Sequence, residues 1–434
     1  MKNVKKGLNV DVIKTISKIK NEPQWVLDIR LKAYEIFLKL KNPTWGPKLD
    51  FIKFSNYIYY FSNIEKNKEL PKKILNEFKK LKVPIEEAKY LNGINDQYNS
   101  ESIIHQLKSE LDEKGVIFCS FDEAIKNHSD LVKKYFTKLV SLADNKYAAL
   151  NTAVFSGGSF IYVPQNVKLD KPLQAYFRIN KQSMGQFERT LIICDKNSSL
   201  HYIEGCTAPI YDKNNLHAAV VEVFVEENAK CRYTTIQNWS ANVLNLVTKR
   251  CIVEKNGSME WIDGNLGSKL NMKYPCTILK GDKSYAKCVS IAVSNKNIIQ
   301  DTGAKMIHIG SNTHSKIISK TIAKKNGISN YRGLVDIKSN SANSFAEVVC
   351  DTLLLDELSS SKTIPTEILA NSTSYIKHEA KVSTIDKEKK FFLECKGFKE
   401  KEINDIISLG FINDFDNELP LEYSVELKRL LKSI

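Results

Sequence analysis

The sequence predicts a mainly β fold in which a stack of short strands forms a solenoid between two helical ends. Three observations predict it. Between about residues 147 and 385, segments of alternating polar and apolar residues replace helical periodicity. Polar turns separate these segments at intervals of roughly 25 to 32 residues, a repeat length typical of solenoids. Helical periodicity is confined to the segments before and after this region.

Residues 1–145 are predicted to form a mainly helical domain. Apolar residues after Trp25 recur at three- and four-residue steps, which places them on one helical face: Val26, Ile29, Ala33, Phe37 and Leu40. Pro23 stands where a helix can begin. A short strand is predicted at residues 116–119, and Ser120 with Glu123 would form a capping box for the helix that follows.

Residues 146–385 are predicted to form the β-solenoid core. Its turns fall near Asp195, Glu227, Asn256, Asp282, Ser311 and Ser339. Residues 196–202, 227–233 and 255–261 share one pattern, in which a polar turn and a small residue precede an alternating strand. A β-sandwich would also contain many strands, but near-register repeats over more than about 200 residues favour stacked coils.

Residues 386–434 are predicted to form a C-terminal helical domain. Ile403, Ile406 and Ile407 lie at helical spacing before Gly410-Phe411. Further apolar residues repeat the three- and four-residue steps after that break: Leu421, Val425, Leu427, Leu430, Leu431 and Ile434.

Composition narrows the possible functions. The formal charge is +14, but the lysines are spread along the chain and interrupted by acids, so no nucleic-acid-binding stripe is expected. No apolar run is long enough for a membrane span, and no secretory signal opens the chain. The nine cysteines are odd in number and widely spaced, without a Cys-x-x-Cys pair. They are therefore expected to be free thiols in a reducing compartment.

Several long strings closely resemble SufB-type members of the SufB/SufD family, which act in the SUF system of iron–sulfur cluster assembly. They lie at residues 7–12, 21–25, 185–193, 202–209, 216–222, 237–239, 247–250, 301–310 and 331–334. The resemblance runs from about residue 7 to the end of the chain and is strongest from 147 to 335.

This resemblance implies a right-handed parallel β-helix that serves as a scaffold and is not itself an enzyme. It also implies several partners: a SufC-type ABC ATPase docked on the C-terminal helices, a SufD-type paralogue or a second copy of the chain, a cysteine desulfurase and a sulfur-transfer protein. The sequence contains no Gly-Lys dipeptide and so no P-loop. An ATP-driven step would therefore need the partner ATPase. The expected location is the bacterial cytoplasm, or the plastid stroma if the gene is organellar.

Cys206 matches the family's sulfur-accepting cysteine, since it lies in Glu204-Gly-Cys-Thr-Ala-Pro209. Sulfur transfer needs a thiolate, because only ionised sulfur attacks efficiently. The alternative for Cys206 is a buried core cysteine. Matching positions for a polar sulfur relay through the interior are Arg178, Asn180, His217, Gln237, Trp239 and Lys249. Each of these could instead be a buried polar residue that holds one coil to the next.

Cys350 matches the cysteine on which a transient cluster, expected to be 4Fe-4S, would form. His378 and Glu379 match the family's His-Glu pair, and thiolate, imidazole and carboxylate can all bind iron. The 28-residue spacing from Cys350 to His378, about one coil, would place them on adjacent rungs. Other family positions differ, with Ser359, Lys362, Leu393 and Ile412 where ligands are common and Lys377 in place of an acid.

Cys194, Cys231, Cys251, Cys276 and Cys288 are interpreted as core packing. Two other functions remain open from the residues alone. A polysaccharide-acting β-helix enzyme would need convergent carboxylates in an exposed groove, and a basic binding module for nucleic acid would rest only on the net charge.

Overall fold

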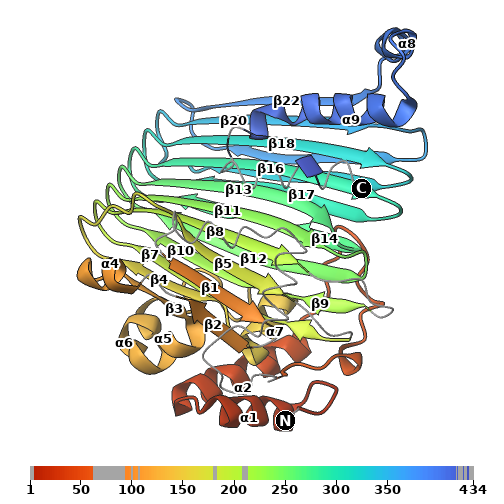
Figure 1. The fold of residues 1–434 in the computed structure, drawn as a ribbon. Coiled ribbons are helices and arrows are strands. Elements are labelled where there is room, and N and C mark those ends of the chain that lie inside the picture. Colours follow the sequence, from red (N-terminus) through yellow and green to blue (C-terminus); the bar gives the residue numbers. More distant parts are fainter. Residues whose placement is uncertain are drawn as a thin grey trace.

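The computed structural model describes residues 4–61, 93–98, 101–105, 108–178, 183–207, 214–416, 418, 424 and 428–429. Parallel strands stack from the N-terminal to the C-terminal end of the molecule, and helices lie at both ends (Figure 1). No helix among these residues is both long and apolar enough to cross a lipid bilayer.

The predicted β-solenoid is confirmed. One sheet contains ten described strands, in the order β2 (Glu101–His105), β1 (Gly93–Tyr98), β5 (Leu173–Arg178), β8 (Ser199–Thr207), β11 (Lys230–Trp239), β13 (Ser258–Gly267), β16 (Tyr285–Asn295), β18 (His314–Lys324), β20 (Phe345–Leu354) and β22 (Tyr375–Thr384). From β5 to β22 every neighbouring pair in this sheet is parallel and in continuous register.

The second sheet contains twelve described strands. Its main path is β3 (Ile117–Ser120), β4 (Ser159–Val163), β7 (Arg189–Cys194), β10 (Val220–Val225), β12 (Val243–Val253), β14 (Leu270–Lys273), β17 (Ile299–His308), β19 (Ile328–Ile337) and β21 (Ser360–Leu369). Three short strands pair beside this path: β6 (Gly185–Gln186), β9 (Asn215–His217) and β15 (Cys276–Leu279). Because side chains alternate along a strand, each sheet turns every second residue toward the shared interior.

The turns at one corner of the solenoid form an asparagine ladder. Asn197, Asn228 and Asn256 have φ angles of 58°, 57° and 53°, in the left-handed region that Asn tolerates better than most residues. The side-chain amide of Asn228 donates to the carbonyl oxygen of Asn197 at 3.0 Å, and that of Asn256 donates to Asn228 at 3.1 Å. The polar turns seen in the sequence therefore link each coil to the one before it.

Helices from the N-terminal region lie at the first end of the solenoid and against the outer face of the twelve-stranded sheet (Figure 1). They are α1 (Val10–Lys20), α2 (Gln24–Lys39), α4 (Lys108–Glu113), α5 (Phe121–Asn127), α6 (Ser129–Tyr135) and α7 (Lys146–Val154), with a 3-10 helix at Phe54–Asn56. The predicted helix after Pro23 and the Ser120 cap are both present, since the Ser120 hydroxyl accepts from the Glu123 amide at 3.1 Å. An ion pair between Arg189 and Glu222, fully buried, lies where this layer meets the sheet.

Two features of this region differ from the expected pattern. Helix α7 lies where strand-like texture was expected to begin, because residues Tyr147 to Val154 are buried on every side and the helix has no polar face to create periodicity. Strand β1 lies in the part expected to be mainly helical, whereas β3 confirms the short strand predicted at residues 116–119. Strand β1 pairs in parallel with β5, and β3 pairs antiparallel with β4, so they cover the edges of the first coil.

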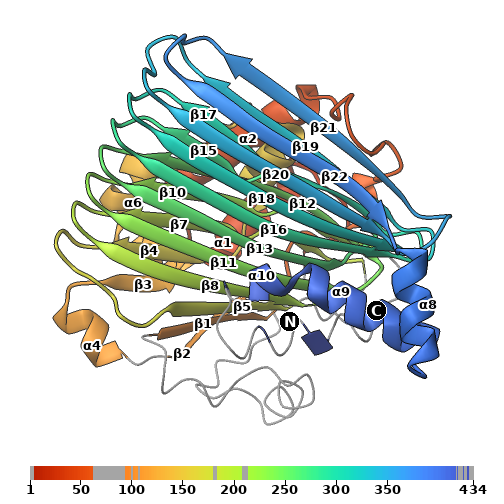
Figure 2. The ribbon, with the colours of Figure 1, turned by 90° about the horizontal axis from the view of Figure 1, so that it is seen from above.

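The C-terminal helices are α8 (Lys387–Cys395), α9 (Glu400–Phe411) and α10 (Asn413–Asp416). Helices α9 and α10 lie on the outer side of the ten-stranded sheet towards its C-terminal end (Figure 1 and Figure 2), where Lys320 of β18 donates to the carbonyl oxygen of Phe411 at 2.9 Å. Ile412 and Phe415 are buried there against an apolar patch that includes Ile236 and Ile291. The helical spacing predicted between Leu421 and Ile434 falls largely outside the described residues.

Candidate functional site

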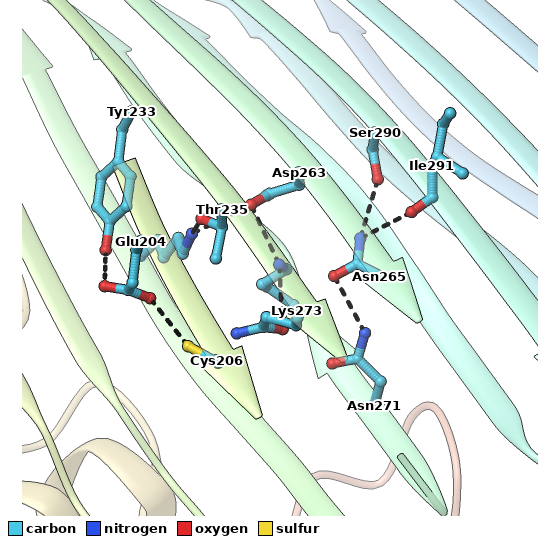
Figure 3. Close-up of polar contacts among 12 residues, drawn as sticks. Glu204, Cys206, Tyr233, Thr235, Asp263, Asn265, Asn271, Lys273, Ser290 and Ile291 are labelled. Carbon is cyan, nitrogen blue, oxygen red and sulfur yellow. Dashed lines mark hydrogen bonds and ion pairs between the residues drawn. The ribbon is translucent and has the colours of Figure 1, made fainter. Parts of the chain in front are cut away.

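The interior between the two sheets contains a cluster of buried polar side chains. Figure 3 shows these side chains extending from neighbouring strands of both sheets toward one another. Burying polar groups is costly unless they are hydrogen-bonded, so a cluster of this size inside a solenoid calls for an explanation beyond packing.

Cys206 faces this interior from β8, with 4% of its surface exposed. Its sulfur lies 3.6 Å from Oε1 of Glu204, and Oε2 of the same carboxylate accepts a hydrogen bond from the Tyr233 hydroxyl. Burial, and then the Glu204 carboxylate, raise the pKa of the Cys206 thiol well above its ordinary value, while Lys249 and Lys273 act in the opposite direction. The two lysines are therefore the groups that favour an anionic sulfur at this position.

His217 is held between two partners in the same interior. Its Nδ1 lies 2.5 Å from Asn245 Oδ1, and its Nε2 lies 2.6 Å from Glu188 Oε2. Burial alone would lower the pKa of His217, but the adjacent Glu188 carboxylate raises it above the ordinary value. The ring of Trp239 lies 4.9 Å from the imidazole, and the Trp239 indole N–H has no partner among the described residues.

Lys249 and Lys273 share one carboxylate. Their ammonium nitrogens each lie 3.1 Å from the same oxygen of Asp263, and all three side chains are 1% exposed. Lys249 also donates to Thr235 at 2.6 Å, and Lys273 donates to Gln237 at 3.3 Å. Burial raises the pKa of Asp263, but the two ammonium groups lower it more, to about 2.

The remaining relay residues predicted from the sequence are only partly described. Arg178 is the last residue of β5, in register with Thr207, and nothing further is described of its side chain. Asn180 lies outside the described residues. Of the predicted set, the structure therefore brings together Cys206, His217, Gln237, Trp239 and Lys249.

Cys350 faces the same interior from β20, with 3% of its surface exposed. Strand pairing places one continuous row of inward residues between it and the Cys206 region: Glu204, Thr235, Asp263, Ser290, Ser319 and Cys350. The path from β8 to β20 crosses five strand spacings, or roughly 24 Å. Burial raises the pKa of Cys350 to about 12, and the neighbouring Tyr331 side chain partly offsets this.

His378 lies on β22, in register with Val348, and turns inward on the side of Cys350. Its Nδ1 lies 2.5 Å from an oxygen of Glu367 on β21, and its buried Nε2 has no partner among the described residues. Glu379 is in register with Val349 and exposed, so it occupies the opposite, outer face of the strand. The structure thus brings His378, and not Glu379, to the inner side of the sheet.

Two family descriptions match this chain. The description "SUF system FeS cluster assembly, SufBD core domain" matches residues 177–411, and "SufBD protein N-terminal region" matches residues 55–175. The chain belongs to the SufBD family. Members of this family act in iron–sulfur cluster assembly, which agrees with the function expected from the sequence.

Relatives within the SufBD family are similar over nearly the whole chain. An iron–sulfur cluster assembly SufBD family protein of Staphylococcus aureus strain MRSA252 is 51% identical over 431 residues, covering 98% of this chain and 93% of the relative. The corresponding proteins of S. aureus strain USA300 and of Staphylococcus haemolyticus are each 50% identical over the same length.

Several interior residues of this SufBD chain were not predicted from the sequence. Buried members of this set are Glu188, Glu204, Asn245, Asp263, Asn271, Lys273 and Gln300. Glu367, which contacts His378 at the exposed last coil, was not predicted either. A usable signal exists for some of them, since Asn245, Asn271 and Gln300 recur at about one coil length. Cys194, Cys231, Cys251, Cys276 and Cys288 are all buried, as expected for core packing.

Within the described part of the chain, no three His, Cys, Asp or Glu side chains converge into a group that could hold a metal ion. Cys350 and His378 nonetheless supply a thiol and a free imidazole nitrogen on neighbouring inward positions of adjacent strands. A cluster built there would be cargo under assembly, and these two side chains suit its iron atoms chemically.

Proposed function

We propose that this chain is the SufB-type scaffold of a SUF assembly complex and not an enzyme. It accepts sulfur on Cys206, relays it through the solenoid interior and assembles a transient 4Fe-4S cluster at Cys350. The observation that carries the proposal is the continuous inward row from Glu204 to Cys350, which connects the surroundings of the two thiols inside one wall of the molecule.

Sulfur acceptance at Cys206 is a thiol–persulfide exchange. The Cys206 thiolate attacks the outer sulfur of a donor persulfide, a new S–S bond forms, and the donor's S–S bond breaks to release the donor thiolate. No net oxidation or reduction occurs in this step. The nearby Lys249 and Lys273 favour the anionic sulfur that results, and His217, held by Glu188, can carry a proton beside the path.

Cluster assembly at Cys350 uses the thiol and the free nitrogen of His378. Binding iron deprotonates a coordinating thiol, which overcomes the raised pKa of Cys350. Glu379, predicted from the family resemblance, would act from the outer face of β22 or after a local rearrangement of this edge strand. Sulfane sulfur must be reduced to sulfide before it enters a cluster, so an external electron donor is also required.

The proposed partners follow from the family resemblance and from two exposed regions. Strands β21 and β22 end the two sheets, and Ile368, Leu369 and Tyr375 there are 46%, 48% and 60% exposed. This edge suits a SufD-type paralogue or a second copy of the chain.

Phe391 and Phe392 on α8 are 67% and 59% exposed and suit docking of a SufC-type ATPase. A cysteine desulfurase with a sulfur-transfer protein would supply sulfur, in the bacterial cytoplasm or the plastid stroma.

Anaerobic reconstitution with two sulfur sources tests the proposal. With iron and added sulfide, we expect the visible chromophore in the wild type and in Cys206→Ala but not in Cys350→Ala. With iron, cysteine, a reductant and a desulfurase, we expect it only in the wild type.

The matched controls are Cys231→Ala and Cys288→Ala, which remove other buried thiols of the same sheet and should leave both results unchanged. A full chromophore in Cys350→Ala, or normal desulfurase-dependent loading in Cys206→Ala, would show that the assigned thiol does not perform its role.

A further inference from the structure

The lysine pair beside Cys206 has an unusual charge balance. Lys249 and Lys273 contact a single oxygen of Asp263, so two buried ammonium groups share one carboxylate. Glu204, the next carboxyl group along the row, contacts Tyr233 and Cys206, while the described hydrogen bonds of the two lysines go to Asp263, Thr235 and Gln237. Buried charges are stable only when they are paired, so this arrangement favours one additional negative charge.

The hydrogen-bonding capacity of the three side chains is also incomplete. Each ammonium group has three donors, and the described contacts use two on each lysine. The second oxygen of Asp263 is buried and has no partner in the described structure. A monoanion that carries one S–H group could accept a hydrogen bond from each lysine and donate one to this free oxygen.

Hydroxyl groups continue from this position toward Cys350 on both walls. On the ten-stranded sheet, Ser290 and Ser319 follow Asp263 in register. On the facing sheet, Thr302 and Tyr331 follow Lys273 in register, and Tyr331 lies beside Cys350. The buried hydroxyls of Ser319 and Thr302 have no hydrogen-bond partner among the described residues.

We propose that Lys249 and Lys273, positioned by Asp263, form a binding site for a monoanionic sulfur species, from which the hydroxyls of Ser290, Thr302 and Ser319 lead to Cys350. The species is either the outer atom of a deprotonated persulfide on Cys206, which accepts from the two lysines, or free hydrosulfide, which also carries the S–H group. Hydrosulfide forms when the external electron donor transfers two electrons to the persulfide: its S–S bond breaks, one proton is taken up and the Cys206 thiolate is released. This inference rests on the proposed function. It assigns the part of the sulfur path beyond Lys249, for which the sequence suggested no residue.

Lys273 makes the site sensitive to pH. Burial lowers its pKa to about 8, against the opposing influence of Asp263. The charged and titratable groups that face it are Asp263, Lys249, Cys206 and Cys288, with Gln237 and Thr302 as neutral neighbours. Lys273 is cationic below about pH 8, so the attraction for an anion is present there and is lost as the pH rises through this value.

The first experiment follows labelled sulfur from cysteine and a desulfurase in the presence of iron. Persulfide is read by alkylation trapping and mass spectrometry of the Cys206 and Cys350 peptides, and sulfide-level sulfur that has reached Cys350 is read as labelled acid-labile sulfide in the cluster. In Lys273→Met we expect normal label on Cys206 and arrival at Cys350 slowed about tenfold or more, since a charge-assisted hydrogen bond is worth that much. Chemically supplied sulfide and iron should still form the cluster. Lys269→Met, which removes an exposed lysine just before β14, is the control.

The second experiment measures the pH profile of arrival at Cys350, normalised to label on Cys206. In the wild type, the rate of sulfur arrival at Cys350 should fall as the pH rises through about 8. In Lys273→Arg it should not fall, because a guanidinium group stays charged. A merely structural lysine would not produce this difference, and the comparison remains valid if Lys273→Met does not fold. Identical profiles, or equal delivery in Lys273→Met and the wild type, would overturn the inference.

Calorimetric titration of Cys206→Ala with sodium hydrosulfide separates the two sources of sulfur. Binding that is lost in Cys206→Ala/Lys273→Met identifies free hydrosulfide as the ligand. An effect of Lys273 on delivery without such binding identifies the persulfide end on Cys206. If label never reaches Cys206 or Cys350 in the wild type, the proposed function itself fails, which is a different result from equal delivery in the variant.

Discussion

The imidazole of His378 is held through one nitrogen and leaves the other free. Its Nδ1 bonds to Glu367, while the buried Nε2 lacks a partner among the described residues. Metal-binding histidines commonly have this arrangement, because the carboxylate fixes the tautomer and the ring orientation. In the proposed function, Glu367 would therefore orient His378 for iron.

Replacing Glu367 by Gln should weaken iron retention at Cys350 by about 10- to 100-fold, the usual cost of losing such a supporting carboxylate. The measurement is the chelator concentration that removes half of the reconstituted iron. Glu347→Gln, which alters an outward carboxylate paired with Lys316 and Lys377, is the matched control. Equal loss of iron in the two variants would contradict the role of Glu367.

Among single residues, the sequence predicted those that belong to strings resembling the family. It missed those whose inward position is decided by strand register. Cys206, His217, Gln237, Trp239 and Lys249 were predicted by resemblance and do share one interior. Asp263, Lys273 and Glu367 were not predicted. A charged residue in an alternating strand is expected to point outward, and only the strand register shows which alternate residues point inward.

The turn between strands is the element that repeats most regularly. Asn228 has a φ of 57° and lies between Asn197 and Asn256 in the ladder of side-chain amides. A residue with a Cβ atom and no local hydrogen bond is strained in this conformation, whereas glycine is not.

Asn228→Ala should therefore lower the free energy of unfolding by about 1–2 kcal/mol, measured by urea denaturation. Asn228→Gly should recover most of the difference, because it removes the strain although the ladder remains broken. If Gly and Ala destabilise equally, the ladder's hydrogen bonds and not the backbone conformation would be the source of the stability.

Element prediction succeeded where the pattern was local. The helix at α2, the Ser120 cap and the alternating strands all follow from residues close in sequence. Helix α7 was missed because burial on all sides removes its amphipathic pattern. Strand β1 was missed because its pairing partner, β5, is distant in sequence, whereas β3 was predicted as the short strand at residues 116–119.

The molecule is a stack of coils whose first end is covered and whose last coil is exposed. The first coils carry β1–β3 and a helical layer, whereas β21 and β22 form the last coil with exposed apolar residues. An open sheet edge of this kind favours addition of another chain. The repeat length in the sequence predicted the stack, but the exposure of its last coil required the structure.

Ile368→Lys on β21 should reduce association with a SufD-type paralogue or with a second copy of the chain, because a charge on the edge strand opposes edge-to-edge pairing. Light scattering coupled to gel filtration measures the change. Leu38→Lys, which alters a side chain of α2 that is 62% exposed, should have no effect. Association that persists in Ile368→Lys would place the interface elsewhere.

The central claim is that sulfur travels inside the solenoid from Cys206 to Cys350, and blocking the row between them tests it most directly. Ser319→Leu fills an inward position next to Cys350, while Lys316→Leu changes the outer face of the same strand. We predict that desulfurase-derived label still loads Cys206 in both variants but fails to reach Cys350 only in Ser319→Leu. Undiminished label on Cys350 in a folded Ser319→Leu protein would contradict the interior route.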